Sequence, residues 1–410
     1  MSDIVLVKSV RTPVGRFLGG LSQFNALDLG AMVIRDLMEQ TKLDPGLVDG
    51  VICGWAAQDY AAKDVAREAA LRAGLPESIV GWTVQRNCAT GMEALSYAQT
   101  RIRAGKGEVY IIAGVESLSN VPNSLPRGID RQRDLLGSRT FYDPLFEGLT
   151  DPHARMLMGG VANYMAHKYG ISKQEQDQVA LWSHQRAHEG EARLREEMVS
   201  AELLGTLPIQ KDEGVRAGLT LENLTALQPF TPFAEQFLAY IREQDPDATG
   251  IPTVTPANAS QISDGGIAAL VMTEERAKAL GYAPLAYVKG IDFTAVRPDH
   301  FPVAPAYSML NAAKAAGLDL KDVSLWDINE AFAVVPIASG RVLREHGFEL
   351  DLENVNVNGG ACAIGHPLGA SGLRILTTVA YEMQRRDAQY GMASICVQGG
   401  LGGTTILERR

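Results

Sequence analysis

Cysteine is scarce in this chain of 410 residues, and its spacing excludes two kinds of site. The four cysteines are Cys53, Cys88, Cys362 and Cys396, and no two of them form a C-x-x-C pair. Structural zinc sites and disulfide frameworks need such pairs or a higher density of cysteine, so we expect neither a metal site nor disulfides. A cysteine with a function here is expected to act as a thiol.

An excess of basic residues and long apolar runs are also missing. The net charge of −10 argues against a nucleic-acid partner, although a local basic patch could still serve an anionic ligand. No apolar run approaches the roughly 20 residues that a membrane-spanning helix needs. The strand-like DIVLVKSV begins at position 3 and leaves no room for a signal or transit peptide. These features predict a cytoplasmic protein.

The chain contains an internal repeat. LDPGLVDGVI (43–52) resembles LDLKDVSLWD (318–327), and CATGM (88–92) resembles GASGL (369–373) at nearly the same separation. Each copy precedes a helix-like stretch and an apolar strand. With 46% hydrophobic residues and 41 glycines, the pattern predicts two similar α/β halves, each built around a mostly parallel sheet. The active site is then expected where the halves meet.

A different pattern separates the two halves. Between residues 119 and 252, a cluster of Pro, Arg and Asp (NVPNSLPRGIDRQRD) is followed by segments of helical periodicity. We therefore predict an N-terminal half at 1–118 plus 253–280, a largely helical insertion at 119–252, and a C-terminal half at 281–410. Four histidines of the insertion have helical spacing and charged neighbours, and we expect them on solvated faces: His153, His167, His184 and His188.

A glycine-rich stretch, VNVNGGACAIGHPLGASGLRI (355–375), holds one histidine, His366, between Gly365 and Pro367. Proline fixes φ and glycine allows close backbone approach, so the imidazole is held rigidly. Such a histidine is suited to proton transfer near neutral pH. The alternative is a structural turn with an incidental histidine.

Two of the cysteines lie where chemistry is expected. Cys88 stands between a strand-like segment and the start of a buried helix, where the helix dipole should lower the pKa of its thiol. The alternative is a small buried hydrophobe. Cys396 ends a short apolar strand and leads into a turn rich in glycine, whose N–H groups suit an oxyanion or a phosphate.

Four motifs, NCATG (87–91), NEAFA (329–333), GHPLGASG (365–372) and the C-terminal CVQGGLGG (396–403), resemble in order and spacing those of the thiolase family. The match runs from SVRTPVGRFLGGLS to the last strand and so covers essentially the whole chain. The resemblance implies an α/β fold of two similar halves, layered α/β/α/β/α, with the insertion as a loop domain that binds coenzyme A. It implies no permanently bound cofactor, since coenzyme A is a substrate.

The resemblance also implies the chemistry. Cys88 would attack the 3-keto carbon of a 3-ketoacyl-CoA and carry the acyl group. His366 would take the proton of Cys88, while Cys396 would protonate the leaving acetyl-CoA carbanion and later deprotonate the incoming CoA. The N–H groups of Cys88 and Gln398 would hold the acyl oxyanion, and His366 with a water on Asn329 would hold the enolate oxygen. Asn329 could instead be a helix N-cap.

Further residues follow from the resemblance. Ser260, in TVTPANASQIS, would contact the pantetheine arm of CoA, Met158 and Phe332 would line its apolar wall, and Arg216 would lie near the nucleotide. Cys53 and Cys362 are interpreted as core packing.

Three departures from the family pattern bear on the substrate. Gln398 stands where glycine is usual, so its side chain should border the acyl pocket, and Leu157 stands where short-chain biosynthetic thiolases often have histidine. Thr90, Met92 and VESLSNVP resemble the β-subunit of the fatty-acid trifunctional complex, although NEAFA keeps an asparagine that those proteins tend to replace.

These departures favour a degradative 3-ketoacyl-CoA thiolase of β-oxidation over a biosynthetic acetyl-CoA C-acetyltransferase. A ketosynthase would have a histidine near Asn329 or Cys396, and a non-catalytic CoA- or lipid-binding relative should have lost Cys88, His366 or Cys396. A homodimer or homotetramer is expected, with a hydratase/dehydrogenase subunit as a possible partner.

Overall fold

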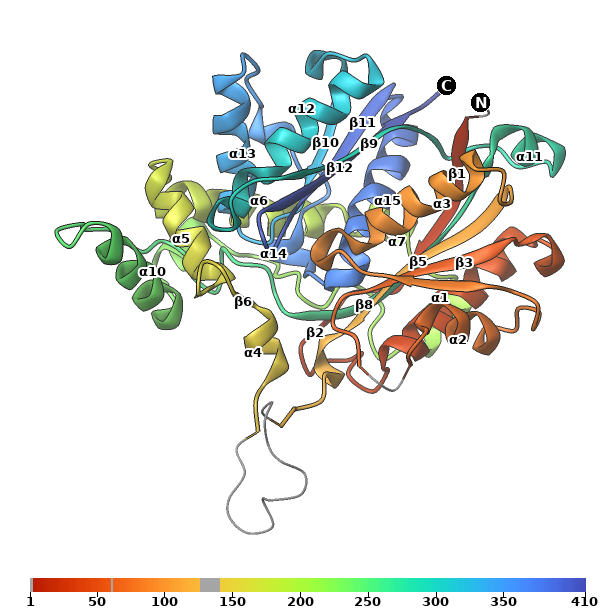
Figure 1. Ribbon diagram of the computed structural model, residues 1–410, viewed down its shortest axis with the longest axis horizontal. Coiled ribbons are helices and arrows are strands. Elements are labelled where there is room, and N and C mark those ends of the chain that lie inside the picture. The colour runs from red at the N-terminus through yellow and green to blue at the C-terminus, as the bar shows by residue number, and fades with distance from the viewer. Residues whose placement is uncertain (1–2, 60–61, 126–140) are drawn as a thin grey trace, which may run out of the picture.

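The computed structural model describes residues 3–59, 62–125 and 141–410, and a ten-stranded sheet runs through it (Figure 1). Part of the predicted Pro, Arg and Asp cluster, residues 126–134, lies outside the described residues. The strand order is β10-β11-β12-β9-β1-β8-β5-β3-β4, with β2 paired to β8. The strands are β1 (Ile4–Arg11), β2 (Gly15–Arg16), β3 (Gly50–Trp55), β4 (Gly81–Val84), β5 (Val109–Ser117), β8 (Ser263–Thr273), β9 (Ala286–Ala295), β10 (Leu325–Ile328), β11 (Tyr390–Val397) and β12 (Leu401–Glu408).

The sheet has a two-fold arrangement about the seam between β1 and β9. Only two residue pairs join these strands, Val5 with Tyr287 and Leu6 with Ala286. Outward from the seam, the order β1-β8-β5-β3 on one side matches β9-β12-β11-β10 on the other. The first repeated stretch forms η1 (Pro45–Leu47) and β3, and the second forms η5 (Leu320–Asp322) and β10.

The prediction of mostly parallel sheets is wrong. Only the pairs β3–β4, β3–β5 and β10–β11 are parallel, whereas β1, β8, β9 and β12 pair antiparallel with all their neighbours. The reason is local: β11 and β12 are joined by a tight turn, and a short turn between adjacent strands forces them antiparallel.

The predicted α/β/α/β/α layering is confirmed. Helices α1 (Ala26–Thr41) and α2 (Val65–Arg72) pack on the outer face of the first half-sheet, and α12 (Ala304–Ala316) and α13 (Val334–Glu345) pack on that of the second. Helices α3 (Thr90–Arg103) and α15 (Leu368–Arg386) share a buried core with both inner faces. A Cβ on Gly91 would lie 2.6 Å from the backbone nitrogen of Leu373, so glycine permits the close approach of the two central helices.

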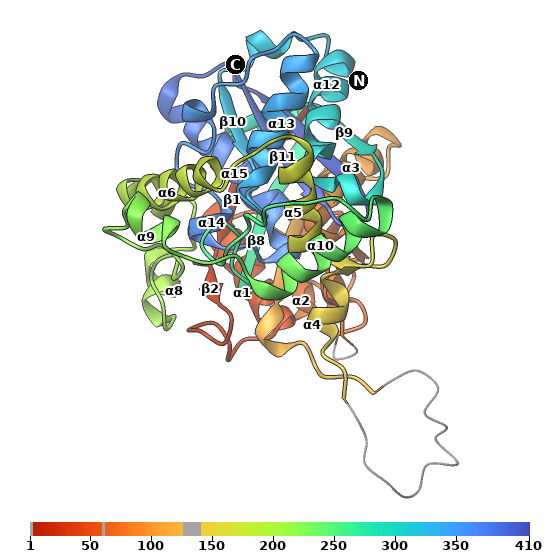
Figure 2. The same ribbon diagram turned by 90° about the vertical axis from the view of Figure 1, so that its left-hand side faces the viewer.

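The segment between the halves is helical, and Figure 2 shows α5 and α10 side by side in it. A short hairpin of β6 (Thr150–Asp151) and β7 (Met156–Leu157) precedes α5. The helices are α4 (Pro144–Gly148), α5 (Met158–Lys168), α6 (Lys173–Glu189), α7 (Glu191–Arg195), α8 (Ala201–Thr206), α9 (Leu221–Thr225) and α10 (Thr231–Gln244). Elsewhere lie α11 (Glu274–Ala279), α14 (Ala361–Ile364), η2 (Asn87–Ala89), η3 (Leu118–Asn120), η4 (Pro298–Val303) and η6 (Leu352–Asn354).

Three of the four histidines of this segment are exposed as predicted, but the prediction for His184 is wrong. His184 is buried in α6, and its Nδ1 accepts a hydrogen bond of 3.1 Å from the backbone N–H of Arg216. Burial lowers the pKa of His184 to about 4, and the charge of Arg216 acts in the same direction. His184 is therefore a neutral, structural acceptor.

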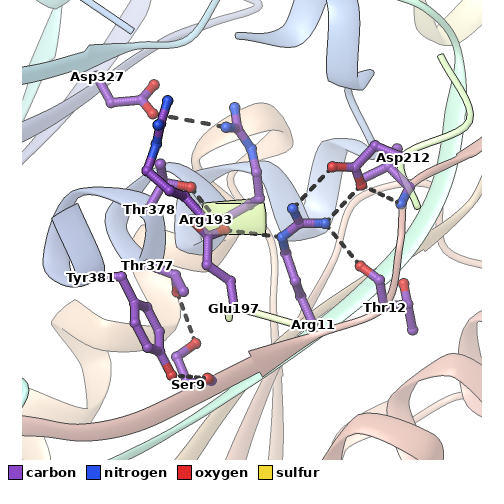
Figure 3. Close-up of polar contacts among 12 residues, drawn as sticks. Ser9, Arg11, Thr12, Arg193, Glu197, Asp212, Asp327, Thr377, Thr378 and Tyr381 are labelled. Carbon is purple, nitrogen blue, oxygen red and sulfur yellow. Dashed lines mark hydrogen bonds and ion pairs between the residues drawn. The ribbon is translucent and has the colours of Figure 1, made fainter. Parts of the chain in front are cut away.

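A buried ion network ties this segment to the central strand β1 (Figure 3). The Arg11 side chain, almost fully buried, donates to both oxygens of Asp212, at 2.8 and 3.0 Å, and to Glu197 at 3.1 Å. The backbone N–H of Arg11 also donates to the carbonyl oxygen of Glu197. A guanidinium between two carboxylates satisfies buried charges that would otherwise be unpaired.

Among the described residues, no helix has the length and apolar character that crossing a membrane requires. The two ends of the chain lie together, where the Arg410 guanidinium pairs with Asp3 at 2.6 Å.

Candidate active site

Cys88 lies in η2, the turn that connects β4 to α3. The residue before it, Asn87, has a φ of 43°, a left-handed conformation that asparagine tolerates better than most residues. The backbone N–H groups of Gln398 and of Cys88 itself are directed at the Cys88 sulfur. Two donors from separate elements therefore meet at one thiol.

The expectation of a lowered pKa for Cys88 is wrong. Although the side chain keeps partial solvent access, burial of the thiol raises its pKa to about 12, and the two N–H groups only oppose this. Desolvation of a thiolate by protein atoms outweighs the partial charge of one helix terminus.

Cys396 is the second-last residue of β11 and lies close to Cys88. Its partner across the β11–β12 hairpin is Gly402, and a Cβ on the next residue, Gly403, would lie 3.4 Å from the Cβ of Ala89. The Cys396 thiol is buried, which raises its pKa well above the usual value, and the charge of a Cys88 thiolate would raise it further. The structure thus brings the two predicted thiols together.

The backbone of His366 is fixed on both sides. Gly365 has a φ of 109°, and the His366 N–H donates to the carbonyl oxygen of Gln261 at 3.1 Å. A Cβ on Gly365 would lie 2.4 Å from the Oγ of Ser263, so glycine is required by both space and conformation.

Ser371, which sequence reasoning missed, fixes the tautomer of His366. Its Oγ donates to the Pro367 carbonyl oxygen at 2.9 Å and lies 2.6 Å from His366 Nδ1. Since the hydroxyl proton goes to the carbonyl, Ser371 accepts from Nδ1–H, and Nε2 is left with a free lone pair. Within the described residues Nε2 has no hydrogen-bond partner, and burial lowers the pKa of His366 to about 3. The serine in the motif GHPLGASG could have indicated from the sequence that His366 has a hydrogen-bond partner nearby.

Asn329 follows β10, and its backbone N–H donates to Ser394 at 2.9 Å, two residues before Cys396. Its side chain is fully buried, and neither amide atom bonds to any part of the chain that the structure describes. The N-cap alternative is wrong, because α13 begins only at Val334 and Asn329 caps no N–H. A buried amide without partners is available to a water or a substrate.

Glu116 is a second residue that the sequence did not indicate. It stands near the end of β5, and its carboxylate accepts from Gly369 at 2.8 Å, in the first turn of α15, and from Ala56 and Ala57. Burial raises its pKa to about 7. A Cβ on Gly372 would lie 3.5 Å from the carbonyl oxygen of Cys88, so this anchoring sets the start of α15 against the Cys88 turn.

The residues predicted to contact CoA fall into two groups. Met158 and Phe332 are buried in the same apolar cluster as Cys396. Ser260 is half-buried beside them, since its N–H donates to Ala331 at 3.0 Å. Arg216 is exposed and contacts His184 through its backbone.

The remaining predictions concern Gln398 and two cysteines. The Gln398 side chain is half-buried and donates from Nε2 to the Thr150 carbonyl oxygen at 3.0 Å, so it reaches the β6–β7 hairpin. Cys53 and Cys362 are both buried, as the packing interpretation requires.

Comparisons with known proteins agree along the whole chain. The family model described as "Thiolase, N-terminal domain" matches residues 4–275, and "Thiolase, C-terminal domain" matches 282–409. The chain is 36% identical to the acetyl-CoA acetyltransferase of Cupriavidus necator and 38% identical to that of Pseudomonas aeruginosa, with all of each chain covered. It is similar in structure to human mitochondrial 3-ketoacyl-CoA thiolase in complex with CoA, at 32% identity and a TM-score of 0.89, with 100% of this chain and 98% of that one covered.

Proposed function

Because this chain belongs to the thiolase family and is an acyltransferase, we propose that it catalyses the CoA-dependent cleavage of 3-ketoacyl-CoA. The products are acetyl-CoA and an acyl-CoA shortened by two carbons. The observation that carries the proposal is the meeting of two thiols, Cys88 and Cys396, with two N–H groups directed at the sulfur of Cys88.

The first half-reaction transfers the acyl group to Cys88. His366 Nε2 accepts the Cys88 thiol proton, and the sulfur attacks the 3-keto carbon. The oxygen of the tetrahedral intermediate receives hydrogen bonds from the N–H groups of Cys88 and Gln398. The bond between C2 and C3 breaks, its electron pair stays on C2, and the Cys396 thiol supplies the proton that makes acetyl-CoA.

The second half-reaction returns the acyl group to CoA. The Cys396 thiolate takes the proton of the incoming CoA thiol, and the CoA sulfur attacks the thioester on Cys88. Cys88 leaves as a thiolate and recovers its proton from His366. Both cysteines and the histidine end the cycle as they began, so the same groups also catalyse the reverse Claisen condensation.

The enolate formed by bond cleavage needs its own stabilisation. His366, which carries a proton on Nε2 at that moment, and a water held by the Asn329 amide would donate to the thioester oxygen. The buried, unpartnered side chain of Asn329 supports this assignment.

Coenzyme A enters as a substrate and is not a bound cofactor. We assign Ser260 to the pantetheine arm, Met158 and Phe332 to the apolar wall, and Arg216 to the nucleotide. We also propose that residues 119–252 form the domain that binds CoA, between an N-terminal half at 1–118 plus 253–280 and a C-terminal half at 281–410. Supporting observations are the cluster that Met158 and Phe332 share with Cys396 and the exposure of Arg216.

A biosynthetic role is the second candidate, because the relatives at 36% and 38% identity are named acetyl-CoA acetyltransferases. The two roles are tested with purified protein. Acetyl-CoA release is measured from acetoacetyl-CoA and from 3-ketoacyl-CoAs of increasing length, and condensation is measured with acetyl-CoA alone. Efficient thiolysis of longer chains supports degradation, and activity confined to acetoacetyl-CoA supports synthesis. Binding of CoA without turnover in either direction would mean a non-catalytic relative.

A further inference from the structure

The hairpin before α5 forms one unit that ends at Met158. Thr150 pairs with Leu157 and Asp151 with Met156, and the Met158 N–H donates to the Leu149 carbonyl oxygen at 2.9 Å. Because these bonds close the loop, a movement of β6 carries Met158 with it. Met158 belongs to the same buried apolar cluster as Phe332 and Cys396, so the hairpin is anchored in that cluster.

Two hydrogen bonds join this hairpin to the turn between β11 and β12. Gln398 Nε2 donates to the Thr150 carbonyl oxygen at 3.0 Å, and the Gly399 N–H donates to Asp151 Oδ2 at 3.2 Å. The other oxygen of Asp151 accepts from the N–H groups of His153 and Ala154, both at 2.8 Å. Asp151 is fully buried, so the carboxylate fixes the loop of the hairpin and the catalytic turn together.

Gln398 lies in this turn and contacts both Cys88 and the β6–β7 hairpin. Its backbone N–H is directed at the Cys88 sulfur, while its side chain holds the hairpin that carries Met158. Gly399 and Gly400 follow with φ of 84° and 79°, so the turn is a tight left-handed one and the Gln398 side chain has a defined direction. A smaller residue at this position could not reach Thr150.

We propose that the Gln398 side chain is a positioning residue for acyl-chain selection, which holds the β6–β7 hairpin and Met158 close to the thiols so that short 3-ketoacyl chains are favoured. This inference rests on the thiolase reaction proposed above. An acyl group on Cys88 would lie beside Gln398, whose N–H is directed at the sulfur and whose side chain bonds to the hairpin, so a longer chain has to displace the hairpin. The hydrogen bond to Thr150 resists that displacement and therefore lowers the rate for long chains more than for short ones.

The test separates the hydrogen bond of Gln398 from its volume. Gln398→Met keeps a side chain of similar length and the backbone N–H but cannot donate to Thr150, whereas Gln398→Ala removes both bond and volume. The ratio of kcat/KM for 3-ketooctanoyl-CoA to that for acetoacetyl-CoA is measured for each. We expect both variants to raise the ratio by about two- to tenfold, the range for loss of one partly buried hydrogen bond. Amide hydrogen exchange over 149–158 should become faster in both.

His153→Ala is the matched control, since its side chain is exposed on the same hairpin. Its ratio and its hydrogen exchange should equal those of the unmodified protein. Gln398→Glu adds a second test: the protonated carboxyl can donate to Thr150, whereas the carboxylate cannot. The ratio should therefore approach that of the unmodified protein at low pH and that of Gln398→Met at high pH.

Three outcomes would overturn the proposal. A shift in Gln398→Ala without one in Gln398→Met would show that the side chain acts only by its volume. An unchanged ratio in both, or unchanged hydrogen exchange in both, would show that the bond to Thr150 positions nothing. Failure of the proposed function is a separate result: the unmodified protein would then cleave none of the 3-ketoacyl-CoAs, while hydrogen exchange would still report on the hairpin.

Discussion

At the scale of single residues, Cys88 shows how competing effects set the charge of a proposed nucleophile. A helix terminus and two backbone N–H groups favour the thiolate, but burial raises the pKa of Cys88 to about 12. Burial also lowers the pKa of His366 to about 3, with Arg374 acting in the same direction. Both shifts favour the uncharged form, so the resting pair is a thiol and a neutral imidazole. The proton then moves only as the sulfur attacks.

This charge state predicts the pH dependence of Cys88 alkylation. At pH values below the pKa of the thiol, each increase of one pH unit raises the thiolate fraction tenfold. With that pKa raised, the rate with iodoacetamide should keep increasing from pH 6 to 9 without levelling off. Cys88→Ser identifies the modified position by mass spectrometry. A plateau that begins near neutral pH would show a preformed thiolate and contradict the neutral pair.

The roles of Cys396 and Cys88 should be distinguished by the reaction step that each substitution impairs. In Cys396→Ala, transfer of acetyl from acetyl-CoA to Cys88 should be lost less than the carbon–carbon chemistry, because its leaving group is a CoA thiolate, which is stable without a proton from Cys396. Thiolysis and condensation should fall much further, since both need a proton moved at C2, where the carbanion is not stable. Single-turnover acylation and steady-state thiolysis are compared on one preparation. Equal losses in both would count against the acid/base role of Cys396.

The residues of the site differ in how far sequence could predict them. Cys88, His366 and Cys396 stand in short glycine-rich motifs whose backbone constraints are local, so their proximity to turns and helix starts was predictable. The pKa values were not, because they depend on burial by segments hundreds of residues away. Asp151 and Glu116 gave no signal, since their roles come from backbone N–H groups brought to them only by the fold.

At the scale of elements, the turn between β11 and β12 joins the strand that carries Cys396 to the proposed oxyanion hole. Gln398→Pro removes the N–H that is directed at the Cys88 sulfur. Loss of one such donor should lower kcat by about 10²–10³-fold. Because proline can distort the turn, the Tm is measured too, and Gln398→Met, which keeps the N–H, is the control. A folded Gln398→Pro enzyme with near-normal kcat would exclude Gln398 from the oxyanion hole.

The sheet illustrates what local patterns could and could not predict. Apolar strands alternating with helices correctly indicated two similar α/β halves. They did not indicate strand direction, because buried parallel strands and buried antiparallel strands both read as continuous apolar runs. The glycine-rich turn after Val397 was visible in the sequence. It was interpreted as a ligand-binding loop, and its second role, as the turn of the hairpin that makes β11 and β12 antiparallel, was not predicted.

At the scale of the whole molecule, the ion pairs of Arg11 should contribute much of the stability of the contact between strand β1 and the segment 119–252. Arg11→Met leaves Glu197 and Asp212 buried without their cation, and breaking such a pair costs on the order of 3–5 kcal/mol. Arg16→Met, which removes an exposed ion pair to Glu213, should change the free energy of unfolding by less than about 1 kcal/mol. Urea unfolding measures both. Equal stabilities of the two variants would contradict the importance assigned to the buried pairs.

The assembly state stays a prediction. A homodimer or homotetramer is expected, with a hydratase/dehydrogenase subunit as a possible partner. Strand β4 lies at one edge of the sheet with all four of its residues half-buried, a position where a second chain could extend the sheet. Sedimentation at several concentrations distinguishes the states, and a monomer throughout would contradict the expectation.

The most direct test of the central claim is to trap the acyl group. Protein is mixed with a 3-ketoacyl-CoA in the absence of free CoA, quenched in acid and digested, and the peptides are examined by mass spectrometry. The account predicts one acyl group, two carbons shorter than the substrate's chain, in thioester linkage on Cys88, and none in Cys88→Ser, which should keep its fold. An adduct on Cys396 instead would reverse the two thiols, and release of acetyl-CoA without any acyl-protein would contradict covalent catalysis by Cys88.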